Sequence, residues 1–239
     1  CAQGQPAFKG EQQHSSEHPG PDAYKGKKVV VIGANNSAHD ICADLVEHGA
    51  QVTMVQRSPT HIVRSETLMD VVLGPLYSEQ AVENGITTDK ADLIFASIPY
   101  KVMPQFHRAA FDEVRRRDAD FYARLEKAGF MLDFGDDDTG LFMKYLRRAS
   151  GYYIDVGASE LIANGSIALA SAPGLNVDHI EPDAVVLSDG RRLPADLIVY
   201  ATGYGSMNGW AAQLISQDVA DKVGKCWGYG SGTTKDLGP

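Results

Sequence analysis

The chain has 239 residues, a formal net charge of -9, and 44% hydrophobic and 22% charged residues. These proportions are those of a globular protein with one large or two small domains. The acidic balance argues against a nucleic-acid surface, which needs concentrated Lys and Arg, and no apolar run is long enough for a membrane span.

The N-terminal residues 1–24 are rich in Gly, Pro, Gln, Ser and His, which predicts a linker rather than an element. They contain neither a basic start nor an apolar core, so we expect no secretory signal. The cysteines Cys1, Cys42 and Cys226 are far apart and form no CxxC pair. This spacing argues against a zinc cluster or a disulfide framework and favours a reducing, cytoplasmic setting.

A strand, a turn, a helix and a second strand follow in order. The β-branched run Lys28 to Ile32 is typical of a buried strand, and Asn36 to His48 has apolar residues on one helical face, closed by Gly49. Residues 51–56 predict the second strand. Together these elements form a β-turn-α-β unit of the size that a parallel crossover requires.

The remaining chain predicts helices and then short strands. Residues 64–150 form a helical insertion whose clearest helix is 107–129. Three closely spaced strand signals, at 166–171, 175–181 and 184–193, predict an antiparallel meander, and an apolar strand follows at 195–200. We therefore predict an α/β fold: a Rossmann-like parallel sheet with a β-meander and a long helical insertion.

The turn between the first strand and the helix, GANNSA, is a degenerate dinucleotide loop. Gly33 would allow the tight turn, and Ala38 would let the helix pack on the strand. Asn35 replaces the second glycine, but Asn tolerates a left-handed backbone. Asn35, Asn36 and Ser37 can donate hydrogen bonds to phosphate oxygens beside the positive end of the helix. The alternative is a plain helix start with Asn36 or Ser37 as N-cap.

The end of the second strand distinguishes between dinucleotides. Arg57 and Ser58 follow it, and no acidic residue occurs before Glu66. An NAD-binding unit carries an acid here for the adenosine 2′-hydroxyl, whereas a guanidinium and a hydroxyl suit a 2′-phosphate. We therefore predict NADP(H), against the alternative of a solvated arginine in a loop.

Three motifs in this order resemble those of the flavin-containing monooxygenases. FKGEQQHSS resembles their FxGxxxHS signature, VVVIGANNSAHDI their NADPH loop, and ATGY the turn that returns to their FAD domain. The resemblance implies that Gly33, Asn35, Asn36 and Ser37 contact the pyrophosphate, and that Arg57 and Ser58 hold the 2′-phosphate. It also implies that Phe8, Gly10 and His14 form the signature segment beside the hinge between the domains. Thr202 and Gly203 would lie near the flavin side of the domain interface.

Two departures from the family pattern bear on its subdivision. Asn35 replaces a glycine, and His18 stands where the family has Tyr or Phe and the related Baeyer–Villiger monooxygenases have Trp. Ser15 after His14 favours the flavin-containing monooxygenases over the Baeyer–Villiger group.

The resemblance implies an NADPH- and FAD-dependent enzyme that inserts one atom of O2 into a small organic substrate at N, S or C. From the cysteine spacing we expect a cytoplasmic protein, and a homodimer is left open. No catalytic side chain and no metal ligand is predicted, because the flavin supplies the chemistry. A Baeyer–Villiger enzyme, a non-catalytic NADP-binding module and a disulfide reductase, which needs a redox cysteine pair, are the alternatives.

The expected organisation is a nucleotide domain with flanking pieces. No glycine motif for FAD occurs in the chain. We therefore expect a signature linker at 1–25, an NADPH-binding domain at 26–205 with its helical insertion at about 64–150, and an incomplete return segment at 206–239.

Several other signals are given ordinary structural interpretations. His39 is predicted on the helix surface, His61 in a loop, and Cys42 in the core. The stretch DFGDDDTG at 133–140 is interpreted as a solvated acidic turn, because it lacks the closing Glu of a calcium loop. Residues 115–117, all arginine, are interpreted as an exposed helix face.

Overall fold

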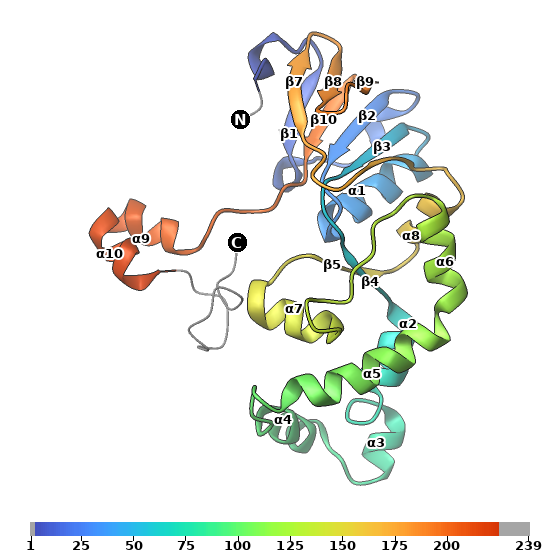
Figure 1. Ribbon diagram of the computed structural model, residues 1–239, viewed down its shortest axis with the longest axis vertical. Coiled ribbons are helices and arrows are strands. Elements are labelled where there is room, and N and C mark those ends of the chain that lie inside the picture. The colour runs from blue at the N-terminus through green and yellow to red at the C-terminus, as the bar shows by residue number, and fades with distance from the viewer. Residues whose placement is uncertain (1–2, 225–239) are drawn as a thin grey trace. The chain divides into compact units, whose positions relative to one another are not determined.

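The computed structural model describes residues 3–224, which form two compact units built from alternating chain segments (Figure 1). Within the described residues, unit 1 contains 3–62, 119–133 and 153–202. Unit 2 contains 63–118, 134–152 and 203–224.

Unit 1 is built on a parallel sheet of five strands, which confirms the predicted α/β class. Every neighbouring pair of strands is parallel. In sheet order the strands are β1 (Glu11–His14), β10 (Leu197–Tyr200), β2 (Lys28–Ile32), β3 (Gln51–Gln56) and β6 (Ala168–Ser171).

The central strands are covered on both faces. Three consecutive valines of β2, residues 29–31, are buried, as expected for a strand of a covered parallel sheet. Helix α1 (Asn36–Glu47) packs on β2 and β3 and buries Ala38, Cys42 and Leu45. The predicted strand–helix–strand unit is confirmed, including Gly49 in a left-handed conformation and Cys42 in the core.

An antiparallel meander packs on the other side of the sheet. It consists of β7 (Val177–Glu181), β8 (Ala184–Leu187) and β9 (Arg192–Pro194), and its apolar residues share one core with Val30 and Ile198 of the sheet. The meander is confirmed, but its predicted strands are not all correct. Residues 168–171 belong to the parallel sheet instead, and 184–193 contains two strands.

Residues 1–24 contain more structure than a linker. The polar strand β1 pairs in parallel with β10 at the edge of the sheet. The segment also holds three 3-10 turns, η1 (Gln5–Ala7), η2 (Ser15–Glu17) and η3 (Asp22–Tyr24). The prediction of an element-free segment is therefore wrong within the described part.

The remaining elements of unit 1 are short. Helices α6 (Ala119–Lys127) and α8 (Ala158–Ala163) pack against each other, and α8 also contacts α1. Strands β4 (His61–Arg64) and β5 (Tyr152–Asp155), whose residues are divided between the two units, form a separate two-stranded sheet.

Unit 2 is helical, as the predicted insertion requires. Its core is formed by apolar residues such as Phe111, Val114 and Met143. Its helices are α2 (Ser65–Thr67), the π-helical η4 (Leu68–Leu73), α3 (Glu79–Glu83), α4 (Thr88–Ala96), α5 (Met103–Arg117), α7 (Gly140–Arg148), α9 (Asn208–Leu214) and α10 (Gln217–Val223). The single helix predicted at 107–129 is two helices, because α5 ends at Arg117 and α6 begins at Ala119.

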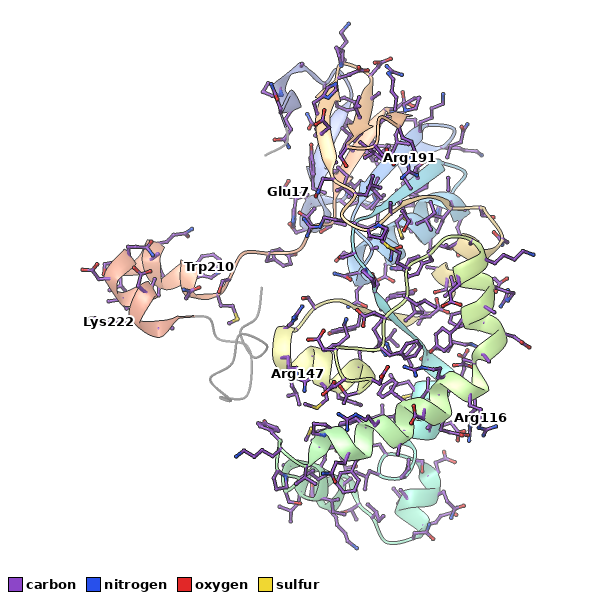
Figure 2. The ribbon with its side chains drawn as sticks, in the orientation of Figure 1. Glu17, Arg116, Arg147, Arg191, Trp210 and Lys222 are labelled. Atoms are coloured by element: carbon purple, nitrogen blue, oxygen red, sulfur yellow. The ribbon has the colours of Figure 1, made fainter. Side chains whose placement is uncertain are left out.

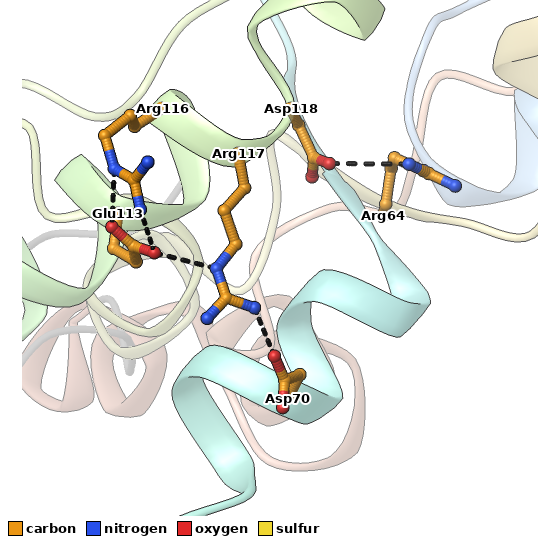
Figure 3. Close-up of polar contacts among 6 residues, drawn as sticks. All are labelled: Arg64, Asp70, Glu113, Arg116, Arg117 and Asp118. Atoms are coloured by element: carbon orange, nitrogen blue, oxygen red, sulfur yellow. Dashed lines mark hydrogen bonds and ion pairs between the residues drawn. The ribbon is translucent and has the colours of Figure 1, made fainter.

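The arginines at the end of α5 form a network of ion pairs (Figure 3). Arg116 and Arg117 both bind Glu113, and Arg117 also reaches Asp70. Arg116 and Arg117 are exposed, as predicted for this face, whereas Arg115 is partly buried with its guanidinium over the ring of Phe134. Such exposed pairs contribute little stability individually because water and salt screen them.

The acidic turn before α7 is only partly solvated. Arg147 of α7, labelled in Figure 2, donates two hydrogen bonds to Asp137, at 2.9 and 2.8 Å. Together with the Thr139 hydroxyl they lower the pKa of Asp137 to about 2. The prediction of a solvated turn is therefore wrong for Asp137, whose carboxylate is used to hold the turn on the helix.

The turn after β2 requires glycine for two reasons. Gly33 has a φ of 136°, which side chains rarely adopt, and an added Cβ would lie 2.2 Å from the carbonyl oxygen of Ala201. That oxygen belongs to the backbone just after β10 and cannot rotate away. Position 33 therefore has no space for a side chain.

We expect Gly33→Ala to lower the free energy of unfolding by about 3 kcal/mol or more, because backbone strain and overpacking add. Gly190→Ala is the matched control, since Gly190 also has a positive φ but would meet nothing within 4 Å. It should cost only about 1–2 kcal/mol. Equal losses for the two variants in denaturant unfolding would contradict the steric account.

His39, on the first turn of α1, is fully buried, so its prediction as a helix-surface residue is wrong. Its ring stacks on Tyr153 with 4.1 Å between centroids and meets the edge of Phe130 at 5.6 Å. Because burial penalises the imidazolium, the pKa of His39 is lowered to about 4. His61, at the start of β4, is buried as well, so the prediction of a loop residue is also wrong.

The buried His39 makes stability depend on pH. In the unfolded chain its imidazole takes up a proton below pH 6.5, whereas in the folded protein it stays neutral down to about pH 4. Stability is thus lost as pH falls, by about 2 kcal/mol between pH 8 and pH 5. Urea unfolding of the wild type and of His39→Phe at both pH values measures the free energy of unfolding. The additional loss of stability at pH 5 should occur in the wild type alone. An equal loss in both proteins would refute the role of His39.

Candidate nucleotide-binding site

A pocket of about 260 Å³ lies at the carboxyl ends of three parallel strands in unit 1. Each of β10, β2 and β3 contributes the residues that follow it, and the segment before β7 completes the wall. The lining residues are Ile32, Gly33, Ala34, Asn35, Val55, Arg57, Ser58, Thr60, Leu175, Asn176, Val177, Ala201 and Thr202.

The pocket lies where the strand order of the sheet changes direction. From β2 the chain proceeds outward through β3 to β6, whereas β10 and β1 lie on the opposite side of β2. Open parallel sheets bind ligands at the carboxyl ends of their strands at such a switch point. Five of the predicted site residues line this pocket: Gly33, Asn35, Arg57, Ser58 and Thr202.

The turn approaches the pocket with its backbone. Gly33 has no side chain, and Asn35 is the N-cap position of α1 but makes no side-chain cap hydrogen bond. By contrast, Ser78 caps α3 and Thr87 caps α4. No side-chain cap therefore covers the N-terminal amides of α1, and such amides favour anions.

Asn35 differs from its predicted conformation. Its φ of -106° and ψ of -165° are extended, so its tolerance of the left-handed region is not used. Helix α1 begins at Asn36, so the alternative N-caps Asn36 and Ser37 are also wrong. Both of these residues are exposed in the first turn of α1, outside the pocket lining.

Arg57 is the single charged residue among those that line the pocket. Its guanidinium has no hydrogen-bond or ion-pair partner within residues 3–224. Every other arginine in that range has a carboxylate within 4.0 Å. The fold thus leaves one guanidinium unneutralised, next to Ser58 in the lining of a pocket without an acid.

Thr60 is a site residue that the sequence analysis missed. It is 2% exposed, and its hydroxyl donates to the carbonyl of Ala34 at 2.8 Å. The segment after β3 is thereby tied to the turn after β2. Nothing in the local sequence marks this residue, because its partner lies 26 positions earlier.

None of the predicted residues of the signature segment lines this pocket. Phe8 belongs to the core beneath the meander. A Cβ on Gly10 would lie 2.3 Å from the backbone oxygen of Asp196, so this glycine permits close packing of β1. His14 accepts a hydrogen bond from the Ser16 amide at its Nδ1, at 3.3 Å.

Thr202 and Gly203 are also separated by the structure. Thr202 lines the pocket and ends unit 1, whereas Gly203 follows it without lining the pocket. Within residues 3–224, Cys42 is the only cysteine; it is fully buried, and burial raises the pKa of its thiol. Cys1 and Cys226 lie outside the described residues.

No helix within residues 3–224 has the length and apolar character needed to cross a membrane.

Comparison with known proteins identifies related sequences. Residues 3–113 match a family described as pyridine nucleotide-disulphide oxidoreductase. The chain is 27% identical over 199 residues to a probable indole-3-pyruvate monooxygenase, YUCCA10, of Arabidopsis thaliana, covering 83% of this chain and 43% of that protein. It is also 27% identical over 203 residues to the indole-3-pyruvate monooxygenase YUCCA8 of rice, Oryza sativa, covering 85% and 41%.

A solved structure has the same fold. A variant of cyclohexanone monooxygenase from Rhodococcus sp. Phi1, bound to NADP⁺, superposes with a TM-score of 0.57 at 17% identity, covering 89% of this chain and 46% of that one. The chain thus spans less than half the length of these relatives. Within that span the predicted resemblance to class B flavoprotein monooxygenases is supported: the chain is similar in sequence to the two indole-3-pyruvate monooxygenases and in fold to cyclohexanone monooxygenase.

Proposed function

We propose that the pocket at the ends of β10, β2 and β3 binds the adenosine end of NADP(H), with Arg57 and Ser58 on the 2′-phosphate. The unneutralised guanidinium of Arg57, in a lining without a carboxylate, carries this proposal. A dianionic phosphate is attracted there, whereas a site for NAD presents an acid to the ribose hydroxyl.

The residues present fit part of a dinucleotide. A volume of about 260 Å³ is just below the range of about 300–1,000 Å³ that is usual for pockets that enclose a drug-sized ligand. It suits the phosphorylated adenosine end, with the remainder extending past Gly33 and the first turn of α1. The missing side chain at position 33 lets the ligand approach the backbone.

We further propose that the chain is the NADPH-binding part of an FAD-dependent enzyme that transfers one oxygen atom from O2 to a small organic substrate. FAD, when bound by the whole protein, would accept the hydride and activate O2. The residues described here would hold the dinucleotide, fix its orientation and select its phosphorylated form. Phe8, Gly10, His14 and Gly203 remain proposed members of the cofactor region.

A thiol-based alternative has little support from the described residues. A disulfide reductase needs a pair of accessible redox cysteines, and Cys42 is single and buried within residues 3–224. A non-catalytic NADP-binding module and a Baeyer–Villiger enzyme differ from the proposal in measurable ways. The full natural polypeptide should be yellow and should consume O2 with NADPH. A colourless NADPH binder supports the module, and conversion of cyclic ketones to lactones supports the Baeyer–Villiger reaction.

The 2′-phosphate assignment is tested by Arg57→Ala. Loss of a charge-assisted contact should weaken NADPH binding by about 1–3 kcal/mol and leave NADH binding almost unchanged. Calorimetric titration of the full polypeptide with each dinucleotide measures both affinities.

Arg191→Ala provides the matched control for this change of charge. Arg191 lies in unit 1 at the turn before β9 (Figure 2), where it is paired with Asp189 at 2.7 Å, and it does not line the pocket. The Arg191→Ala protein should bind both dinucleotides with the affinities of the wild type. A wild-type protein with equal affinity for NADPH and NADH would rule out the assignment.

A further inference from the structure

Two buried side chains hold consecutive carbonyl groups in the turn between β2 and α1. The Thr60 hydroxyl donates to the carbonyl of Ala34 at 2.8 Å. The His39 ring donates from Nδ1 to the carbonyl of Asn35 at 3.0 Å. Because a carbonyl oxygen can only accept, this bond requires the proton of the neutral ring to be on Nδ1.

Both donors are themselves held in place. The Thr60 amide donates to the carbonyl of Met131 at 3.0 Å, and the amide of Asp133 donates to the carbonyl of Thr60 at 3.2 Å. The His39 ring packs against the rings of Tyr153 and Phe130. The hydrogen-bond donors are therefore rigid before any ligand arrives.

The orientation of the carbonyls determines that of the amides. In a trans peptide the C=O and the next N–H point in opposite directions, and residues 3–224 contain no cis peptide. Turning the carbonyls of Ala34 and Asn35 toward Thr60 and His39 turns the amides of Asn35 and Asn36 away from these donors. Asn35 lines the same pocket as Arg57, and α1 has no side-chain cap.

We propose that Thr60 and His39 are positioning residues, which pre-organise the amides of Asn35 and Asn36 to bind the dinucleotide's pyrophosphate. The inference rests on the proposed function, because it concerns the same ligand. A flipped peptide would present a carbonyl oxygen to the anion and leave a buried donor unpaired. The two side chains prevent that flip through the carbonyl groups that they hold.

Thr60→Val tests this role because it removes the hydroxyl and keeps the shape. The pyrophosphate is common to both dinucleotides, so NADP⁺ and NAD⁺ should each bind about five- to tenfold more weakly, with their affinity ratio unchanged. Thr60→Ser restores the hydroxyl and should restore both affinities. Calorimetry on the full polypeptide, well below its unfolding temperature, gives these values.

His39→Phe provides a second test should Thr60→Val fail to fold. It removes the donor and keeps an aromatic ring against Tyr153 and Phe130. The expected loss is smaller, about two- to fivefold for each dinucleotide, because the backbone amide of His39 also donates to Asn35, at 3.1 Å.

Two control variants separate positioning from stability. Thr53→Val makes the same change on β3, outside the pocket, and should alter nothing. Ile180→Val removes a methyl group from the core of unit 1, and should reduce stability without weakening binding.

The outcomes distinguish the inference from the proposed function. Wild-type affinities in Thr60→Val, failure of Thr60→Ser to restore them, or an equal loss in Ile180→Val would each overturn the positioning role alone. Wild type with no preference for NADP⁺ over NAD⁺ would overturn the 2′-phosphate assignment. Wild type that binds neither dinucleotide would overturn both.

Discussion

The close contact between the turn after β2 and the carbonyl group of Ala201 is the constraint on which the site depends. It exists because position 33 has no side chain, and it lets β2 and β10 end next to each other. Thr202 and Asn35, far apart in the sequence, thereby line one pocket. A larger residue at position 33 would separate the strand ends at the point where the sheet reverses its order.

Arg57 differs from the other arginines of the described residues because it has no ion-pair partner. In the described residues the other arginines are used in ion pairs, some of them bidentate, as Arg147 is with Asp137. Some of these pairs join different elements, as Arg117 does with Asp70, and others lie within one helix or turn. An arginine whose partner is absent from the fold gains no stability from its position. Its position is better explained by attraction to an anion that the folded chain does not contain.

The sequence predicted those parts of the fold that depend on local pattern. The β2–α1–β3 unit follows from apolar periodicity and from Gly33 and Gly49. The strand β1 was missed because its residues, EQQH, are polar, and its pairing with β10 is formed across almost the whole chain. The burial of His39 was missed for a similar reason. Its covering rings, Phe130 and Tyr153, come from segments about a hundred residues away, which no helical pattern reveals.

In the proposed site, different groups provide the affinity for a dinucleotide and the selectivity for its phosphorylated form. Backbone amides at the start of α1 would meet a group that both nicotinamide dinucleotides share, so they strengthen binding without discrimination. Arg57 would meet the one group in which the dinucleotides differ. The amides need rigid carbonyls behind them, which buried donors such as Thr60 and His39 supply, whereas an exposed guanidinium can adjust its own direction. Rigid backbone donors and an adjustable side chain therefore suit these two tasks, because ordering the backbone on binding would reduce the affinity for both ligands.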